Sequence, residues 1–531
     1  MATVTESPAA DVTHLPEFRN EPVEDFSRPE VRERYLAALA AARRELGKEY
    51  PCLVGAENRE RRSERKFKSL NPSKFTEVVG VHQESSPELA REAVTAALKA
   101  FESWSRAKPE TRIALVRRAA QLLRERKAEY TAWLTLETGK TLPEATGDVE
   151  ETIDFAEYYA RQAAHLFLHP PKMTQMPGER DEFRYIPLGV GAVIPPWNFP
   201  SALMAGMTFS AIVCGNTVVL KPSSDSATVA AKFLQILDDA GIPKGVVNLV
   251  TGGGAVVGTA LVDDPRIRFI SFTGSKAVGL EVHERAAKTQ PGQKWIKRTV
   301  LEMGGKDAIL VNDDADLDSA VEGVAVSAFG YQGQKCSACS RVIVHEKIYD
   351  QFVAKLVERA KKITVGPADD LANYMGPVIN ERAMQKIQEY IEIGKKEGRM
   401  VLGGQKVPEG GYFIPPTIIA DLPPTARLAQ EEVFGPVLAV IKCKSFDEGL
   451  AIVNNTEYGL TGAVYTKDPA KLERAANEVF VGNLYLNRKC TGAMVGAHPF
   501  GGFNMSGTDS KAGGPDYLLL FTQGKSIGRK L

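Results

Sequence analysis

Residues 191–222 read GAVIPPWNFPSALMAGMTFSAIVCGNTVVLKP. A strand-like run at 191–195 leads into a helix-like run at 201–214 and a second apolar run at 217–221. The alternation continues with strands expected at 246–250 and 267–272 and helices expected at 227–240, 255–262 and 276–287. Strands and helices alternating at this spacing predict a parallel, doubly wound α/β sheet. Such sheets bind ligands at the carboxyl ends of their strands.

The alternation restarts after Gly305. Strands are expected at 308–311 and 342–344, and helices at 317–329 and 349–363. Upstream, Ser86 followed by Pro87 and Glu88 is typical of a helix start, and further helices are expected at 111–127 and 149–166. A chain of 531 residues is also too long for a single core. We therefore predict an α/β protein with two α/β domains that join near residues 303–306.

Composition excludes several classes of protein. Hydrophobic residues make up 44% and charged residues 25%, and 66 basic side chains balance 66 acidic ones, which argues against a nucleic-acid surface or a polybasic membrane patch. The first residues carry no basic start and no apolar core, so we expect a cytoplasmic protein. The uncharged run at 197–220 has the length of a membrane span, but polar residues such as Asn198 and Thr208 interrupt it, which favours a buried helix followed by a strand.

The segment FGYQGQKCSACSR, residues 329–341, contains the candidate nucleophile. Cys336 stands beside Lys335 in a Gly, Gln and Ser context, which is typical of a reactive thiol. Cys336 and Cys339 also form a C-x-x-C pair, for which a redox dithiol or half of a zinc site are the alternatives. No second pair and no histidine cluster accompanies it, so we predict no metal and favour a single nucleophile.

Two upstream segments, residues 195–200 and 301–308, offer partners for this thiol. Attack of a thiolate on an aldehyde creates an oxyanion, which the carboxamide of Asn198 and the N–H of Cys336 can stabilise. Glu302 can activate water to hydrolyse the resulting thioester; the alternative is a surface carboxylate at a domain junction, but the apolar neighbours Leu301 and Met303 argue against full exposure. A free cysteine has a pKa of roughly 8.5, so a nearby cation or helix start is expected to supply the thiolate.

The chain has no standard dinucleotide glycine turn. Neither the glycines at 189–191 nor those at 252–254 complete G-x-G-x-x-G. The run FTGS at 272–275 leads from a strand into a helix and suits an anion site at the helix start, or an ordinary tight turn. Lys221 ends a strand where a nucleotide ribose can lie, or where a lysine is simply solvated.

Five ordered motifs resemble the aldehyde dehydrogenase superfamily: PPWNFP, FTGS, LEMGGKDA, FGYQGQKCSA and EEVFGPV, within residues 51–507. The resemblance implies a variant Rossmann cofactor domain, a catalytic α/β domain and a small β oligomerisation arm. It implies Cys336 as nucleophile, Glu302 as general base and Asn198 as oxyanion donor. It also implies NAD as cofactor, bound by Pro196, Trp197, Lys221, Ser223, Gly254, Phe272, Thr273, Gly274, Ser275, Glu432 and Phe434.

Residues 483–518, with FRNEP at 18–22 and YIEIGK at 390–395, resemble the L-glutamate γ-semialdehyde dehydrogenase subfamily. The resemblance implies NAD-dependent oxidation of this semialdehyde, in equilibrium with 1-pyrroline-5-carboxylate, to L-glutamate, the second step of proline degradation. Substrate contacts are then expected from Glu151, Ser337, Gly492, Ala493 and Phe500. Two positions depart from the pattern. Ser224 replaces an acid common in NAD-selective members and leaves NADP use open, and His498 replaces a glutamine.

The resemblance also divides the chain. A frayed tail is expected at 1–17, an NAD-binding domain at 18–167 and 188–302, a catalytic domain at 303–505, and an oligomerisation arm at 168–187 and 506–531. We expect a monofunctional homo-oligomer that acts on a small molecule and binds neither nucleic acid nor membrane. A dehydrogenase for another semialdehyde or an aliphatic aldehyde is the alternative within the family. An inactive binding or structural relative is the alternative outside it.

Overall fold

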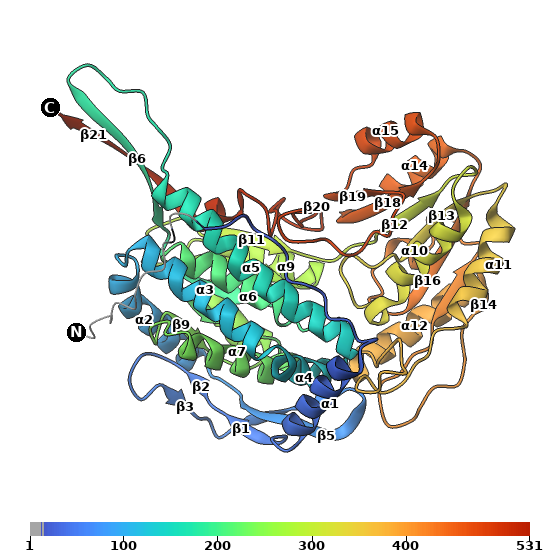
Figure 1. The fold of residues 1–531 in the computed structure, drawn as a ribbon, viewed down its shortest axis with the longest axis horizontal. Helices are drawn as coiled ribbons and strands as arrows, with labels where there is room; N and C mark the ends of the chain where they lie inside the picture. The colour runs from blue at the N-terminus through green and yellow to red at the C-terminus, as the bar shows by residue number, and fades with distance from the viewer. Residues whose placement is uncertain (1–11, 13–14) are drawn as a thin grey trace.

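The computed structural model describes residue 12 and residues 15–531, and its first lobe is built on a seven-stranded sheet (Figure 1). Five strands run parallel in the order β9, β8, β7, β10, β11. They are β7 (Val190–Ile194), β8 (Thr217–Leu220), β9 (Val247–Leu249), β10 (Ile267–Thr273) and β11 (Arg298–Glu302). In chain order this is 3-2-1-4-5, the doubly wound arrangement, so the predicted parallel sheet is confirmed. Antiparallel β2 (Cys52–Leu53) and β3 (Glu60–Arg61) complete the edge.

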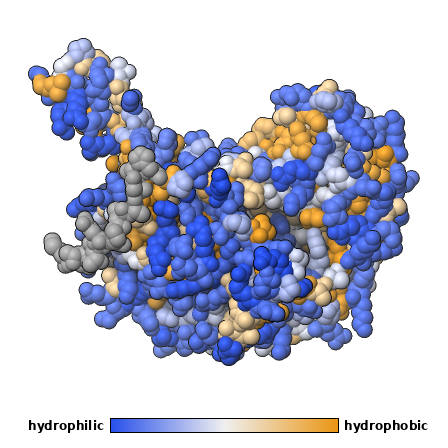
Figure 2. Space-filling view, in the orientation of Figure 1, coloured by the Kyte–Doolittle hydropathy of each residue, from blue (hydrophilic) through white to orange (hydrophobic). Residues whose placement is uncertain are grey.

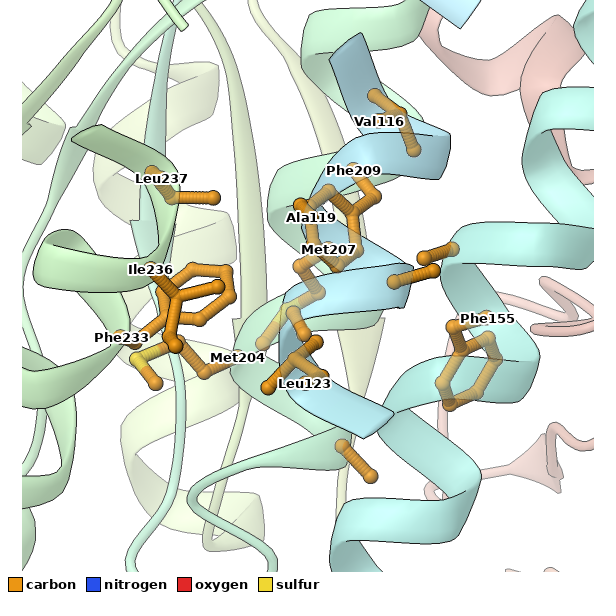
Figure 3. Packing of buried hydrophobic residues seen from close by; sticks show 14 of the residues in the cluster. Val116, Ala119, Leu123, Phe155, Met204, Met207, Phe209, Phe233, Ile236 and Leu237 are labelled. Carbon is orange, nitrogen blue, oxygen red and sulfur yellow. The ribbon is translucent and has the colours of Figure 1, made fainter. Parts of the chain in front are cut away.

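Helices cover both faces of this sheet because successive strand residues point to opposite sides. Ala192 packs in the cluster under α2 (Pro87–Trp104), α8 (Thr259–Asp263) and α9 (Lys276–Ala287), whereas its neighbour Val193 packs in the opposite cluster. That larger cluster joins α1 (Pro29–Arg43), α3 (Pro109–Glu125), α4 (Lys127–Thr138), α5 (Leu142–Leu168), α6 (Ala202–Val213) and α7 (Ala227–Asp239). Figure 3 shows α3, α6 and α7 meeting through side chains such as Leu123, Met204 and Phe233.

Local sequence signals set most of the element ends. The Ser86 hydroxyl accepts a hydrogen bond from the Leu89 N–H at 3.3 Å, so the predicted start of α2 is confirmed. The helix predicted at 149–166 in fact begins at Leu142, because Pro143 occupies a first-turn position where it suits a helix start. The helix predicted at 255–262 is divided into a π-helical turn at Gly254–Gly258 and α8.

The second lobe is a separate seven-stranded sheet. Its parallel strands are β15 (Thr417–Ala420), β16 (Val437–Cys443), β13 (Arg341–His345), β12 (Ala308–Val311), β18 (Thr461–Tyr465) and β19 (Asn483–Leu486), with antiparallel β14 (Arg399–Leu402) at one edge. The helices of this lobe are α10 (Leu317–Phe329), α11 (Tyr349–Ala360), α12 (Glu381–Glu397), α13 (Arg427–Gln430), α14 (Phe446–Asn454) and α15 (Pro469–Glu478). The predicted second α/β domain is thus confirmed.

A two-stranded arm projects from the body in Figure 1. β6 (Glu179–Pro187) pairs antiparallel with β21 (Thr522–Lys530), from Thr522 opposite Pro187 to Lys530 opposite Glu179. Smaller sheets are formed by β1 (Lys48–Tyr50), β5 (Lys74–Gln83) and β4 (Lys66–Asn71), and by β17 (Tyr458–Gly459) and β20 (Phe503–Asn504).

The predicted extent of the arm was too long. Residues 506–521 pack on the body instead, because the 3₁₀ turn Tyr517–Phe521 buries Tyr517, Leu518 and Phe521 in the core of the first lobe. The strand that follows pairs with β6 of the same chain.

Two further predictions concern the ends and surfaces of the fold. Of the tail predicted at 1–17, residues 1–11 and 13–14 lie outside the described residues. Val12 is buried, and the carbonyl of the exposed Pro16 accepts a hydrogen bond from Arg161 of α5 at 2.8 Å. The uncharged run 197–220 forms α6 and β8, as expected. Within residue 12 and residues 15–531, no helix combines the length and apolar character needed to cross a bilayer.

Candidate active site

The candidate site lies where segments that follow strands of the first sheet meet segments that precede strands of the second. Asn198 follows β7 and Glu302 ends β11, whereas Cys336 precedes β13. The five residues between Glu302 and β12 carry the chain from one sheet to the other. The prediction that the site lies at the carboxyl ends of the strands therefore agrees with the first sheet. The second sheet faces the candidate site with the amino ends of its strands.

A strained turn positions the nucleophile segment. Tyr331 and Gln332 both adopt left-handed backbone angles, with φ of 48° and 56°, and each such residue costs about 1 kcal/mol or more. The conformation is held by Gln332, whose side-chain amide donates to Pro377 O at 2.7 Å, and by Gln334, whose side chain accepts from Ile379 N–H at 2.9 Å. The turn is therefore fixed from several sides.

Asn198 is attached directly to this turn. Its side-chain nitrogen donates to the Gln334 carbonyl at 3.0 Å, two residues before Cys336, and the side chain is buried. A carboxamide carries two N–H donors, and this contact uses one of them. Within the described residues no partner is seen for the second donor, so it is available to a ligand.

The Cys336 thiol is not activated by its neighbouring lysine, contrary to the sequence-based expectation. Lys335 Nζ instead pairs with Glu144 of α5 at 3.0 Å. Burial raises the pKa of the Cys336 thiol well above its usual range, and the negative charges of Asp307 and Glu302 raise that pKa further. The free thiol is therefore protonated at neutral pH.

Glu302 is positioned as a weakly acidic carboxyl group. Its Oε1 accepts a hydrogen bond from the Ser510 hydroxyl at 2.7 Å, and within the described residues its buried Oε2 has no partner. Burial raises the pKa of Glu302 to about 8, although the Ser510 hydrogen bond and the charge of Lys511 act in the opposite direction. A carboxyl group with this pKa can accept a proton from water near neutral pH.

Residues 506–511 are part of the site, although the sequence assigned them to the arm. Gly507 forms an antiparallel bridge with Glu302, and Thr508 N–H donates to Leu301 O at 3.0 Å. Lys511 Nζ donates to Gly482 O at 2.7 Å and so anchors the segment to the second lobe. Ser510 and Lys511 lie in the segment GTDSKAGG, whose small and polar residues suit a loop, and this was the available signal.

The expected cofactor residues gather along the carboxyl edge of the first sheet. Pro196 and Trp197 follow β7, Lys221 and Ser223 follow β8, Gly254 lies after β9, and Phe272 and Thr273 end β10. Ser275 is the N-cap of α9, where its hydroxyl accepts from Val278 N–H at 3.4 Å. A Cβ on Gly274 would lie 2.5 Å from the Phe272 ring, so the position takes glycine, and the Gly274 N–H donates to the Glu302 carbonyl at 3.0 Å.

Lys221 has an unusual environment for a lysine. Its side chain is buried, and Nζ donates to the carbonyl of the next residue, Pro222, at 2.9 Å. Burial lowers the pKa of Lys221 to about 8. An ammonium group has three N–H donors, and the contact with Pro222 uses one of them. The other two can donate to hydroxyl groups of a ligand.

Two expected cofactor residues reach this edge from the second lobe. The Phe434 ring packs edge-to-face on Trp197, with ring centroids 5.6 Å apart, and Phe434 holds a left-handed φ of 63°. Glu432 Oε1 accepts from Gly305 N–H at 3.1 Å. Burial raises the pKa of Glu432. The structure therefore brings the β7 loop, the inter-sheet segment and EEVFGPV together.

The expected substrate residue Glu151 lies on α5 within a group of buried charges. Burial raises the pKa of Glu151 to about 8, and the nearby charge of Asp148 raises it further. Asp148 itself pairs with Lys140 at 2.8 Å, and the Lys140 ammonium lies 3.7 Å from the centre of the Phe199 ring. This helix thus borders the segments that carry both Asn198 and Cys336.

The other expected substrate residues come from two segments of the second lobe. Ser337 follows Cys336, and its carbonyl accepts from the Thr461 hydroxyl at 3.4 Å. Gly492, with φ of 81°, and Ala493 lie in the loop after β19. Phe500 N–H donates to Ala512 O at 2.8 Å, which ties Phe500 to the segment of Lys511.

An N-terminal segment contacts this loop, and no local sequence pattern predicts its position. The Asn20 side chain donates to Val495 O at 3.1 Å and to Asp154 of α5 at 2.8 Å. Phe18 packs edge-to-face on Tyr158 with centroids 5.1 Å apart. Residues 18–20 therefore link α5 to the loop that holds Gly492 and Ala493.

The cysteines and other candidate ligands form no second chemical centre. The six cysteines are free thiols, and Cys339 and Cys490 are buried in the core of the second lobe. Within the described ranges, no group of three His, Cys, Asp or Glu side chains is placed to hold a metal ion.

The sequence model of the aldehyde dehydrogenase family matches residues 59–527. The chain belongs to the aldehyde dehydrogenase family. A 1-pyrroline-5-carboxylate dehydrogenase of Geobacillus kaustophilus is 54% identical over 510 residues, which cover 96% of this chain and 98% of that protein.

Solved structures of this family share the whole fold. The 1-pyrroline-5-carboxylate dehydrogenase of Thermus thermophilus, as its R100A mutant, and the enzyme from Thermus with bound NAD each give a TM-score of 0.95 at 48% identity. Each match covers 97% of this chain and 100% of the other. The variant Rossmann domain, catalytic domain and arm expected from the resemblance are thus confirmed as a fold.

Proposed function

We propose that this protein is an NAD-dependent dehydrogenase that oxidises L-glutamate γ-semialdehyde to L-glutamate, the second step of proline degradation. The observation that carries the proposal is the convergence of Cys336, Asn198 and Glu302 between two sheets. A thiol, an amide donor and a carboxyl base are the set that covalent oxidation of an aldehyde needs. The 54% identity to a 1-pyrroline-5-carboxylate dehydrogenase supports the substrate.

The chain's residues fit a dinucleotide. Lys221 offers a buried ammonium with unused donors to ribose hydroxyls, and the start of α9 at Ser275 would face an anion such as a pyrophosphate. Glu432 and Phe434 would hold the nicotinamide end against Trp197. When bound, NAD would supply the hydride acceptor.

The first half of the reaction depends on Cys336 and Asn198. The Cys336 thiol gives up its proton to solvent as its sulfur bonds to the aldehyde carbon, and the N–H of the Asn198 carboxamide stabilises the oxyanion of the thiohemiacetal that forms. Because Asn198 is fixed to the Gln334 carbonyl, its donor is oriented before the charge develops, which is the condition for strong electrostatic stabilisation. Loss of hydride leaves a thioester on Cys336.

The second half depends on Glu302. In its carboxylate form Glu302 removes a proton from water, and the hydroxide attacks the thioester carbonyl. The products are L-glutamate and the Cys336 thiol. Because burial holds the pKa of Glu302 at about 8, this step accelerates as the pH rises toward that value.

Substrate selection is assigned to α5 and to the loop after β19. The Ser337 hydroxyl and the backbone N–H groups of Gly492 and Ala493 would hold the α-carboxylate, Glu151 would face the α-ammonium group, and Phe500 would pack on the carbon chain. Neutral donors plus one acid suit a small zwitterion and leave its aldehyde end free to reach Cys336.

The proposal is tested by NADH production from L-glutamate γ-semialdehyde, succinic semialdehyde, propanal and hexanal at matched concentrations. We expect the highest kcat/KM for L-glutamate γ-semialdehyde. A preference for propanal or hexanal would refute the substrate, and absence of NADH with every aldehyde would favour the inactive binding or structural relative. The same assay with NADP in place of NAD measures how well the enzyme uses the phosphorylated cofactor. Ser224 lacks the acidic side chain that would repel its 2′-phosphate.

We further propose that residues 18–167 and 188–302 bind NAD, that residues 303–505 form the catalytic domain, and that the protein is a cytoplasmic homo-oligomer.

The edge strand β19 of the second sheet supports the oligomer. Leu486 on this strand and Phe480 before it are exposed. Figure 2 shows apolar surface over the part of the second lobe where Figure 1 places β19. An arm strand of another copy can extend such an edge. Light scattering that gives a monomer at micromolar concentration would refute the oligomer.

A further inference from the structure

The loop at residues 491–494, here called the anion loop, presents two backbone donors that the described chain does not use. Gly492 and Ala493 lie after β19, and the N–H groups of both residues donate to no group within the described residues. Gly492 has a left-handed φ of 81°. Consecutive N–H groups around such a residue form a concave site that suits an anion.

Arg488 holds this loop from the opposite side. Its Nη2 donates to the carbonyl oxygens of Thr491 and Gly492, each at 3.1 Å. Its guanidinium lies over the Tyr485 ring, 4.3 Å from the ring centre. Two hydrogen bonds and an aromatic face therefore fix Arg488 relative to both β19 and the loop.

The two hydrogen bonds from Arg488 also determine the direction of the Gly492 and Ala493 N–H groups. The Thr491 carbonyl and the Gly492 N–H belong to one peptide unit, and the Gly492 carbonyl and the Ala493 N–H belong to the next. A trans peptide is planar, so its C=O and N–H point in opposite directions. When Arg488 draws both carbonyls toward itself, both N–H groups are directed away from it.

The anion loop is also held at its far end and lies beside a cation. Met494 N–H donates to the His498 ring nitrogen Nδ1 at 3.3 Å, and His498 N–H donates to Met494 O at 2.8 Å. Lys489 Nζ lies 3.5 Å from the position that a Cβ on Gly492 would occupy. The site therefore combines two fixed donors with a nearby positive charge.

We propose that Arg488 is the positioning residue that fixes the Gly492 and Ala493 amides for a carboxylate and so selects aldehydes that carry an α-carboxylate. This inference rests on the proposed function, because it concerns how that substrate is held. Arg488 acts through the backbone and does not itself bind the substrate. A lysine at this position keeps the charge, but its flexible stem does not fix the donor nitrogen as the planar guanidinium group stacked on Tyr485 does.

The test compares Arg488→Ala and Arg488→Lys with the wild-type enzyme, using L-glutamate γ-semialdehyde and propanal as substrates. Two hydrogen bonds from a charged donor stabilise the loop, so we expect KM for the semialdehyde to rise about tenfold or more in both variants. We expect kcat for the semialdehyde and kcat/KM for propanal to stay within about twofold of wild type. The inhibition constant of L-glutamate should rise in parallel with KM.

The controls separate this inference from simpler explanations. Arg399→Ala removes an exposed arginine whose partner is Asp421 and should change neither substrate constant. Retained propanal oxidation shows that each variant is folded. Full recovery of KM in Arg488→Lys would overturn the inference, because charge alone would then suffice. An equal loss for propanal would also overturn it, as would an unchanged KM. A wild-type enzyme that prefers propanal would instead refute the proposed function.

Discussion

Removing the Ser510 hydroxyl should shift the pH dependence of turnover, because that hydroxyl stabilises the charged form of the general base. It donates to Glu302 Oε1 at 2.7 Å, and burial holds the pKa of Glu302 at about 8. At pH 7 about one tenth of Glu302 is then ionised. A hydrogen bond that favours the carboxylate lowers its pKa, so the Ser510→Ala variant must have a higher one.

The size of the shift follows from the strength of this bond. Hydrogen bonds to charged groups contribute about 1.5–3 kcal/mol, and one pKa unit corresponds to about 1.4 kcal/mol. We therefore expect the pKa of Glu302 to rise by about one to two units in Ser510→Ala. The ionised fraction at pH 7 falls about tenfold or more, and steady-state turnover falls with it. Above about pH 10 the variant should approach wild-type turnover, since Glu302 is then largely ionised in both.

The assay is kcat against pH from about 6 to 11 at saturating NAD and L-glutamate γ-semialdehyde, together with the pre-steady-state burst of NADH. The burst reports on Cys336 and should keep its wild-type rate. Ser506→Ala is the matched control, because its hydroxyl accepts from Gly459 N–H and does not contact Glu302. An ascending limb that stays near pH 8 in Ser510→Ala, with the burst intact, would refute the assignment of Glu302 as the base in thioester hydrolysis.

Three further predictions test separate parts of the structure. Glu302→Gln should give a burst of NADH near one equivalent of enzyme, followed by slow turnover with no ascending limb near pH 8; loss of the burst would mean that Glu302 acts before hydrolysis. Asn198→Ala should slow the burst about 100- to 1000-fold with little change in NAD affinity measured by fluorescence titration, and a normal burst rate would exclude Asn198 as the oxyanion donor. Ser86→Ala should lower the free energy of unfolding by about 1 kcal/mol in urea, whereas Ser103→Ala in the same helix, which removes no cap, should change it far less.

Much of the fold was predictable because it depends on local patterns. Apolar runs at 217–221 and 308–311 became β8 and β12, since a buried parallel strand has to be apolar along its whole length. The Ser86 cap was predictable because only a few short side chains suit a helix start and Pro87 follows directly. The candidate nucleophile Cys336, amide Asn198 and base Glu302 were predictable because the chemistry of each side chain limits the role that it can take.

The sequence by itself determined the two α/β sheets and the identities of the reactive groups. Only the tertiary structure decided their protonation and their partners. Glu302 meets Ser510 across 208 residues, and Lys335 is drawn to Glu144 across 191. The raised pKa of Cys336 comes from burial and from carboxylates on other segments. Burial and charge proximity depend on how distant segments pack, and the local sequence around Cys336 does not contain that information.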